Sequence, residues 1–395
     1  MSKEEKRVPE VRFEGFYDDW KQRKLRDISE KVTEKNKDKK FTETFTNSAE
    51  YGIVPQNDFF DKVISNSKNI SNYYIVQNDD FVYNPRISNF APVGPIKRNK
   101  LNKVGIMSPL YYVFRTKNID LTFLEKFFDT SYWHRFMKLN GDTGARADRF
   151  AIKDSVFKEM PIPYPSSDEQ AKIGNLLKQI DNIIALHQRK LDKLQELKKA
   201  LLQPLFPKKD EVIPKVRFTN FNEPWKQCKL KDMLKERNEQ IQESDNYPLM
   251  SFVQGVGVTP KNDRYNRNFL VKHNNKKYKK TELGDFIYSS NNLETGSIGI
   301  NKEGKAVISP VYSIFSSKNN LESQFIGILS TRKDFINKML RFRQGVVYGQ
   351  WRIHEKDFLN INVTIPSYRE QGKIVSLFEN LDKSIVLYQT KLEKL

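Results

Sequence analysis

Residues 8–27 read VPEVRFEGFYDDWKQRKLRD, and residues 213–232 read IPKVRFTNFNEPWKQCKLKD. Eleven of the twenty aligned positions are identical, including Arg12/Arg217 and Trp20/Trp225. A second match lies further along each copy, where residues 169–194 and 370–395 share thirteen of twenty-six positions and both begin with Glu-Gln. A repeat of this extent indicates that the chain contains two copies of one structural plan.

The two copies share their ends and differ in their middles. Asp80-Phe81-Val82-Tyr83 recurs as Asp285-Phe286-Ile287-Tyr288, but most of the intervening sequence does not match. Binding residues sit on variable loops held by rigid elements, so this unevenness predicts one scaffold with two different binding surfaces. We predict a first module at 1–165, a helical spacer at 166–205, a second module at 206–366 and a second, shorter helical spacer at 367–395.

The matching blocks at the end of each copy have the apolar spacing of a long helix. Apolar residues recur at alternating intervals of four and three, which predicts a coiled-coil seam. Pro165-Ser166 and Pro366-Ser367 precede the two blocks and suit a helix start. Packing of each helix on its own domain is the alternative to pairing of the two helices. The seam positions are Ile173, Leu177, Ile180, Ile184, His187, Leu191, Leu194, Lys198 and Leu201 in the first block, and Ile374, Phe378, Leu381, Ile385, Tyr388, Leu392 and Leu395 in the second.

The middles of the two copies have mixed character. Short β-rich runs occur at 81–83, 111–114, 286–288 and 311–315, and helical spacing of apolar residues occurs at 124–139 and 325–340. Strands interleaved with helices predict an α+β fold, with two similar mixed α/β modules separated by two long helices that pair as an antiparallel coiled coil.

The composition favours a polyanionic partner. The 395 residues include 68 Lys and Arg against 49 Asp and Glu, which gives a formal net charge of +19. The one cysteine, Cys228, excludes a disulfide framework and a cysteine-cluster metal site. No apolar run is long enough to span a membrane, and Met1–Arg7 leads into no signal-peptide core, so we expect a cytoplasmic protein.

Catalytic motifs are weak. Gly299–Lys305 has the spacing of a phosphate-binding P-loop, but Ala306 stands where that motif needs a Ser or Thr hydroxyl for Mg²⁺. The four histidines show no metal-ligand spacing. We therefore assign no catalytic residue and no metal ligand, and keep an NTP-binding enzyme that uses Gly299–Lys305 as an alternative hypothesis.

Two polar and basic stretches occupy equivalent places in the two copies. Arg, Asn and Gln read base edges through bidentate hydrogen bonds, and Lys contacts phosphates. An ordinary solvated surface is the alternative interpretation for any single residue. The candidate DNA-contacting residues are Arg86, Asn89, Lys97, Arg98, Arg146 and Arg149 in the first copy, and Asn291, Asn292, Arg343, Tyr348, Gln350 and Arg352 in the second.

The whole pattern closely resembles the specificity subunit of type I restriction–modification systems. The resemblance rests on the two divergent modules, on their shared openings (Val11-Arg12-Phe13 with Trp20-Lys21, and Val216-Arg217-Phe218 with Trp225-Lys226), and on the Ile-Pro approach to each Glu-Gln helix. It implies two target-recognition domains, each reading half of a bipartite asymmetric duplex DNA site, and two helices that pair antiparallel as a spacer. The second helical block is shorter than the first, which departs from that pattern.

The resemblance also implies a set of partners. Two modification subunits, which bind S-adenosylmethionine and methylate adenine, would dock on the helices, and restriction subunits would add ATP-driven, Mg²⁺-dependent translocation and cleavage. The chain itself would then be no enzyme and would need no cofactor, in agreement with the weak catalytic motifs. A coiled-coil RNA-binding adaptor is the remaining alternative.

Overall fold

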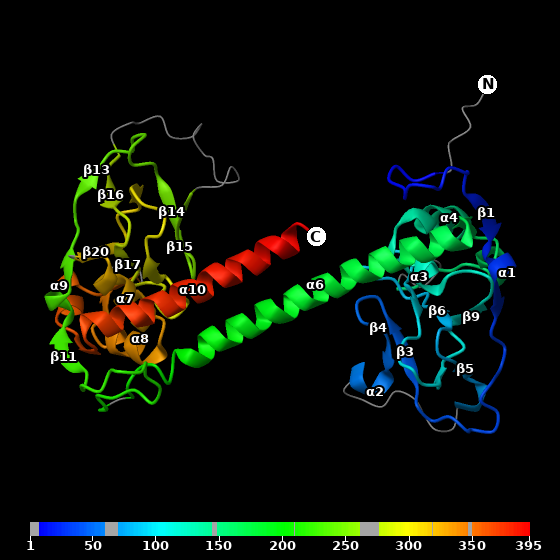
Figure 1. Ribbon diagram of the computed structural model, residues 1–395, viewed down its shortest axis with the longest axis horizontal. Coiled ribbons are helices and arrows are strands. Elements are labelled where there is room, and N and C mark those ends of the chain that lie inside the picture. The colour runs from blue at the N-terminus through cyan, green and yellow to red at the C-terminus, as the bar shows by residue number, and fades with distance from the viewer. Residues whose placement is uncertain are drawn as a thin grey trace. The chain divides into compact units, whose positions relative to one another are not determined.

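The computed structural model describes residues 8–59, 70–143, 148–208, 210–260, 276–317, 319–346 and 350–395. The chain divides into two compact units, Met1–Ile184 and Ala185–Leu395, and each unit contains one divergent module. The division falls within helix α6 (Ser167–Leu201), which is labelled in Figure 1.

The first unit is built on a four-stranded antiparallel sheet with the order β2-β9-β6-β7. Three two-stranded sheets, β1-β10, β3-β4 and β5-β8, surround it. The strands are β1 (Lys21–Lys24), β2 (Ser29–Lys31), β3 (Phe45–Ser48), β4 (Gly52–Pro55), β5 (Tyr74–Val76), β6 (Phe81–Tyr83), β7 (Ile96–Arg98), β8 (Gly105–Met107), β9 (Tyr112–Thr116) and β10 (Pro161–Tyr164). The helices are α1 (Leu25–Ile28), α2 (Gln56–Phe59), α3 (Leu121–Asp129), α4 (Tyr132–Asn140) and α5 (Asp154–Phe157), with a 3₁₀ turn at Ile70–Asn72.

The second unit repeats this topology. Its four-stranded sheet has the order β12-β20-β17-β18, and its smaller sheets are β11-β23, β14-β15, β13-β16-β19 and β21-β22. The strands are β11 (Lys226–Lys229), β12 (Leu234–Glu236), β13 (Gln240–Ile241), β14 (Met250–Val253), β15 (Gly257–Pro260), β16 (Tyr278–Thr281), β17 (Phe286–Tyr288), β18 (Ile298–Ile300), β19 (Ala306–Ile308), β20 (Ser313–Ser317), β21 (Gln344–Val346), β22 (Gln350–Arg352) and β23 (Asn362–Ile365). The helices are α7 (Leu321–Ser330), α8 (Lys333–Leu340), α9 (Glu355–Leu359) and α10 (Tyr368–Glu393), with a 3₁₀ turn at Leu230–Asp232.

Both faces of each four-stranded sheet are buried. Side chains alternate between the two faces of a strand, so Phe81 and Tyr83 pack with α3, while Val82 packs with Phe45 under the smaller sheets. Phe286, Ile287 and Tyr288 divide in the same way in the second unit. The matched Asp-Phe-Val-Tyr and Asp-Phe-Ile-Tyr segments are therefore the central strand of each sheet, and their conservation between copies reflects packing.

The predicted α+β fold with two similar mixed α/β modules and two long helices is confirmed, with one difference in the shorter helices. Each expected helix, at 124–139 and at 325–340, is two helices: α3 and α4 in the first unit, α7 and α8 in the second. The hydroxyls of Thr130 and Thr331 donate to the carbonyls of Phe127 and Ile328, three residues earlier, where the first helix of each pair ends. Apolar spacing continues across each break because both helices pack on one core.

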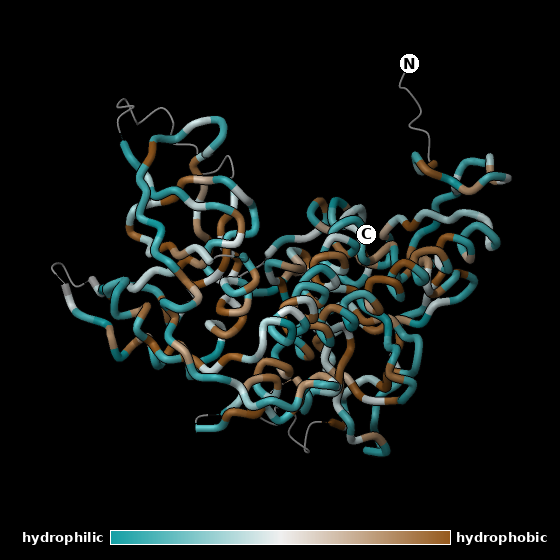
Figure 2. The backbone as a smooth tube through the Cα atoms, turned by 60° about the vertical axis from the view of Figure 1, so that its left-hand side comes forward, coloured by the Kyte–Doolittle hydropathy of each residue, from teal (hydrophilic) through white to brown (hydrophobic). Residues whose placement is uncertain are grey.

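The two long helices begin where the sequence predicts. Backbone N–H groups of the first turns donate to the hydroxyls of Ser166 and Ser367. Hydrophobic and hydrophilic segments alternate along the backbone (Figure 2). The seam positions are the less exposed ones, apart from Ile184 and Leu395. None of the described helices combines the length and apolar character that crossing a membrane requires.

Within the second unit, α10 packs on α7 and contacts the last part of α6. The rings of His187 and Tyr388 lie 5.4 Å apart, and Lys198 forms an ion pair with Asp382. Residue numbers rise along α6 while they fall along α10, so this part of the two helices runs antiparallel. Pairing along the whole predicted seam belongs to the proposal below.

Candidate nucleic-acid interface

Four connections of the first module meet at one end of its four-stranded sheet. They are residues 48–51, 84–95, 108–111 and the described part of 141–153, and we call this region the loop end. Tyr83, which ends β6, pairs with Tyr112, which begins β9. The Asn47 amide donates to the carbonyl of Val82 at 2.7 Å, and the Asn84 amide donates to the carbonyl of Asn47 at 2.8 Å. These bonds hold the 48–51 turn beside the 84–95 loop.

The 84–95 loop is closed by a tight turn at its tip. Ser88 and Ala91 exchange two backbone hydrogen bonds of 3.1 Å, which leaves Asn89 and Phe90 exposed between them. At the base of the loop, Phe150 donates its backbone N–H to Pro85 at 2.8 Å. The loop is therefore fixed at both its tip and its base.

The predicted residues of the first module fall into two groups. Arg86 and Asn89 lie on the 84–95 loop, and Arg86 forms a β-bridge with Arg149, so these three are at the loop end. Lys97 and Arg98 lie on β7, where they form ion pairs with Asp129 and Glu125 of α3, both at 2.8 Å. Arg146 is outside the described residues.

These ion pairs are tight. Burial would raise the pKa of Asp129, but the hydrogen bond and charge of Lys97 hold that pKa below its usual value. Arg98 is only 13% exposed. Lys97 and Arg98 thus fix α3 to the sheet, whereas the side chain of Arg86 is 68% exposed and has Asp148 only at 3.9 Å.

The second module has an equivalent loop end. The β14–β15 turn approaches the 289–297 loop, where the N–H of Gly255 donates to the carbonyl of Gly296 at 3.1 Å. Asn291 and Asn292 are exposed on that loop. The backbone N–H of Trp351 in β22 donates to the Asn291 side chain at 2.6 Å. The loop and the β21–β22 hairpin are thereby held together.

Arg343 braces this second loop end. It donates to both carboxylate oxygens of Glu294 and to the carbonyl of Ser290, and its guanidinium lies 5.3 Å from the Trp351 ring centroid. The hydrogen bond from Arg343 lowers the pKa of Glu294. Arg352 is 55% exposed. Tyr348 is outside the described residues, and of Gln350 only the backbone is described.

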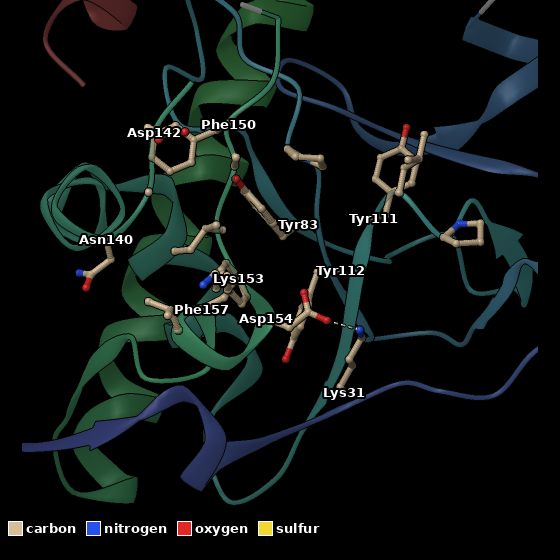
Figure 3. Close-up of a pocket in the computed structure, with 17 residues that line it drawn as sticks. Lys31, Tyr83, Tyr111, Tyr112, Asn140, Asp142, Phe150, Lys153, Asp154 and Phe157 are labelled. Carbon is tan, nitrogen blue, oxygen red and sulfur yellow. Dashed lines mark hydrogen bonds and ion pairs between the residues drawn. The ribbon is translucent and has the colours of Figure 1, made fainter. Parts of the chain in front are cut away.

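A cavity of about 650 Å³ opens beside the loop end of the first module (Figure 3). Aromatic residues, including Tyr83, Tyr112 and Phe150, line it together with Asn140 and Lys153. Burial, with a contribution from Asp154, raises the pKa of Tyr112 to about 12, so its hydroxyl stays protonated at neutral pH.

The corresponding place in the second module carries a different charge, with two glutamates in place of an ion pair. In the first module, Lys31 at the end of β2 forms an ion pair with Asp154, which begins α5. By topology their counterparts are Glu236, which ends β12, and Glu355, which begins α9; both line a hollow there. The two loop ends therefore share a scaffold but present different chemistry.

The described part of the chain supports neither a metal site nor the P-loop. No three His, Cys, Asp or Glu side chains there gather in a way that could hold a metal ion. Gly299–Lys305 forms a turn between strands β18 and β19, whereas a P-loop leads from a strand into a helix. Lys302 pairs with Asp382 at 3.1 Å, and Lys305 lies over the Tyr247 ring. Gly299–Lys305 therefore does not support the hypothesis of an NTP-binding enzyme.

The fold and loop ends define a protein with two recognition modules. The family model for the type I restriction modification DNA specificity domain matches residues 17–196 and again residues 222–395. The chain therefore belongs to this family and contains two copies of its domain. It is the DNA specificity subunit of a type I restriction–modification system, a non-catalytic recognition protein.

Individual relatives agree with this assignment. The type I restriction enzyme MjaVIII specificity subunit of Methanocaldococcus jannaschii is 23% identical over 316 residues, which cover 75% of this chain and 72% of the relative. The MjaIX specificity subunit of the same organism is 33% identical over 110 residues, or 28% of this chain and 22% of the relative. The crystal structure of a type I restriction–modification S subunit from M. genitalium covers 97% of this chain and 94% of its own, with a TM-score of 0.56 and 15% identity, and so shares the fold.

Proposed function

We propose that each module reads one half of a bipartite, asymmetric duplex DNA site with its loop end. The observation that carries the proposal is the identical strand order of the two four-stranded sheets beneath different loops. One scaffold with two sets of loops gives two independent specificities. A difference between the two half-sites then makes the whole site asymmetric.

The two kinds of contact at a loop end have different tasks. Exposed polar side chains such as Asn89 and Asn292 present groups that hydrogen-bond to base edges in the major groove, where every base pair has its own donor–acceptor pattern. Arg86, Arg149 and Arg352 hold phosphates or guanines. Arg98 and Arg343 act indirectly by fixing α3 and the second loop end, because their guanidinium groups are already paired. Lys97 acts in the same indirect way through its ion pair with Asp129. Arg146, Tyr348 and Gln350 complete the proposed set.

The long helices separate the modules in this proposal and dock the catalytic partners. In the second unit, α6 and α10 are joined by the ring contact of His187 with Tyr388 and by the ion pair of Lys198 with Asp382. These contacts support an antiparallel spacer. Leu176, Ile183, Leu186, Leu197, Val386 and Leu387 are exposed on these helices and offer apolar surface to two modification subunits. Those subunits would supply S-adenosylmethionine chemistry, and restriction subunits would supply ATP- and Mg²⁺-dependent translocation and cleavage, in the cytoplasm where DNA is accessible.

Module exchange tests independent recognition. Residues 213–366 are replaced with the second module of another specificity subunit, and methylated adenines are mapped across the genome of cells that carry the complete system. We expect one half of the methylated sequence to change and the other half to stay the same. A change in both halves would show that the modules do not read DNA independently.

A further inference from the structure

Phe90 is the most exposed phenylalanine among the described residues. Its side chain is 80% exposed at the tip of the 84–95 loop, and Tyr51, on the neighbouring 48–51 turn, is 65% exposed. A ring exposed to water at the tip of this loop contributes nothing to the core of the module.

The loop is built to keep Phe90 in this position. Ala91 and Val93, on the carboxyl side of the tip, are buried, and Ser88 adds a hydroxyl acceptor 3.2 Å from the N–H of Ala91. Gly94 has a φ of +84°, and a Cβ placed there would lie 2.1 Å from the carbonyl oxygen of Asn84. The chain therefore turns back sharply behind Phe90, and the ring cannot fold onto the core without breaking the turn.

The scaffold itself does not require the projecting ring. The loop between β6 and β7 has twelve residues, 84–95, whereas the equivalent loop between β17 and β18 has nine, 289–297. In that shorter loop the apolar residue, Leu293, is fully buried. The loop that projects Asn89 and Phe90 is thus three residues longer than its counterpart.

The surroundings of Phe90 indicate what the ring meets. Arg86 is exposed four residues earlier and is bridged through its backbone to Arg149. An exposed ring on the same loop as an exposed arginine suits duplex DNA better than an apolar protein surface, because the arginine holds a phosphate while the ring enters between bases. Proteins that bind the minor groove bend DNA by inserting Phe, Leu, Ile or Met between base steps, and Phe90 would make the same kind of insertion from the loop that also carries Asn89.

We propose that Phe90 is a wedge that inserts at one base-pair step within the half-site of the first module and kinks the duplex there. This inference rests on the proposed function and deepens it. Pyrimidine–purine steps unstack most easily, so the wedge selects such a step through the deformability of the DNA, in addition to the hydrogen bonds that read base edges. Phe90 then determines specificity at a position where no side chain reads the bases.

The test uses the full chain copurified with its modification subunits, and duplexes that contain the mapped site. In each duplex, 2-aminopurine replaces one base of the first half-site in turn, because its fluorescence rises when the base unstacks. We expect fluorescence to rise at one step with the unaltered chain and with Phe90→Leu, and to stay low with Phe90→Ala. We also expect Phe90→Ala to bind the intact site about 10-fold more weakly, in the range that base–aromatic stacking supplies.

The matched control is Tyr132→Ala, which removes a ring that is 83% exposed in the same module. Tyr132 begins α4, eight residues or about 12 Å before the end of that helix at the loop end. We expect it to bind like the unaltered chain. A duplex with a mismatch at the responsive step should recover most of the affinity lost in Phe90→Ala, because the step is already opened.

Three results would contradict the proposal that Phe90 is a wedge. In the first, Phe90→Ala leaves the affinity for DNA and the fluorescence unchanged. In the second, it weakens binding equally at mismatched and intact sites, and in the third it releases the modification subunits, which would make Phe90 a protein contact. In each of these cases specific binding by the unaltered chain would preserve the proposed function. Absence of any preference for the mapped site would instead contradict the proposed function itself.

Discussion

Two arginine–glutamate pairs, one in each module, join the entry segment to the first turn of the long helix. Arg12 donates to both oxygens of Glu169, at 2.6 and 2.9 Å, and Arg217 donates to both oxygens of Glu370, at 2.7 Å each. Both glutamates are only 1% exposed. Breaking a buried pair leaves an uncompensated charge, so we expect Arg217→Ala to lower the free energy of unfolding of the second unit by about 3 kcal/mol.

Urea unfolding of the full chain measures this loss. Lys215→Ala is the control, since it removes an exposed positive charge from the same segment, and we expect it to change the stability little. Equal midpoints for Arg217→Ala and Lys215→Ala would show that the pair does not stabilise the unit.

The first pair also predicts a dependence on pH. Burial alone would raise the pKa of Glu169, but the hydrogen bonds and the charge of Arg12 hold that pKa below the usual value of 4.5. The unfolded chain then takes up this proton at a higher pH than the folded chain does. The stability that the carboxylate provides is complete above about pH 4.5 and is lost as the pH falls through the lower pKa of the folded state. We therefore expect thermal unfolding of the first unit to depend more steeply on pH below 4.5 in the unaltered chain than in Glu169→Gln. Parallel pH profiles would contradict this assignment.

Single residues mark the limit of what the sequence predicts. The sequence shows only that Glu169-Gln170 is repeated as Glu370-Gln371. The structure adds a physical role for Gln170, because its side-chain amide donates to the carbonyl of Pro165. The sequence could not tell that Arg98 and Arg343 have carboxylate partners, because Glu125 and Glu294 are brought to them by tertiary folding. Phe90 gave a weak signal, as an aromatic residue next to Ser88 and Asn89 in a loop rich in proline, which the search for charged residues passed over.

At the scale of elements, the fold of the 84–95 loop depends on Gly94. Alanine there combines a left-handed φ with a steric clash against the carbonyl of Asn84, so the loop must rearrange. We expect Gly94→Ala to weaken binding to the first half-site at least about 10-fold, the scale of one or two lost contacts, while the second half-site is still read. Mapping methylation with each half-site altered in turn measures this. Gly15→Ala is the control, since Gly15 also has a positive φ but open space around it; an equal loss in both variants would exclude a specific role for the loop.

Elements differ in how well the sequence predicts them. The runs at 81–83 and 286–288 were predicted exactly, because a strand buried on both faces is a short continuous apolar run in any context. The breaks between α3 and α4 and between α7 and α8 were missed, because apolar periodicity does not register a threonine that ends a helix. The small sheets were not predicted, since strands of three or four residues give too short a pattern.

At the scale of the whole molecule, α6 is the one described element shared by both units, so its length sets their separation in our proposal. Residues 181–186 of α6 are all exposed, between the ion pair of Asp181 with Lys126 and the ring contact of His187 with Tyr388. Seven residues inserted after Ile184 would leave both contacts in place and keep the apolar seam in register, with a drift of only about 20°.

Such an insertion lengthens α6 by about 10 Å, or roughly three base pairs of duplex at about 3.4 Å each. The gap along the DNA grows by less if the helices are inclined to the duplex and the partner helix is not lengthened. We expect the two half-sites to stay unchanged while the unread gap between them lengthens by about one to three base pairs, as read from mapped methylated adenines. Four inserted residues serve as the control, because they turn the seam out of register and should impair modification altogether. Full activity with the original gap after the seven-residue insertion would show that α6 does not set the spacing.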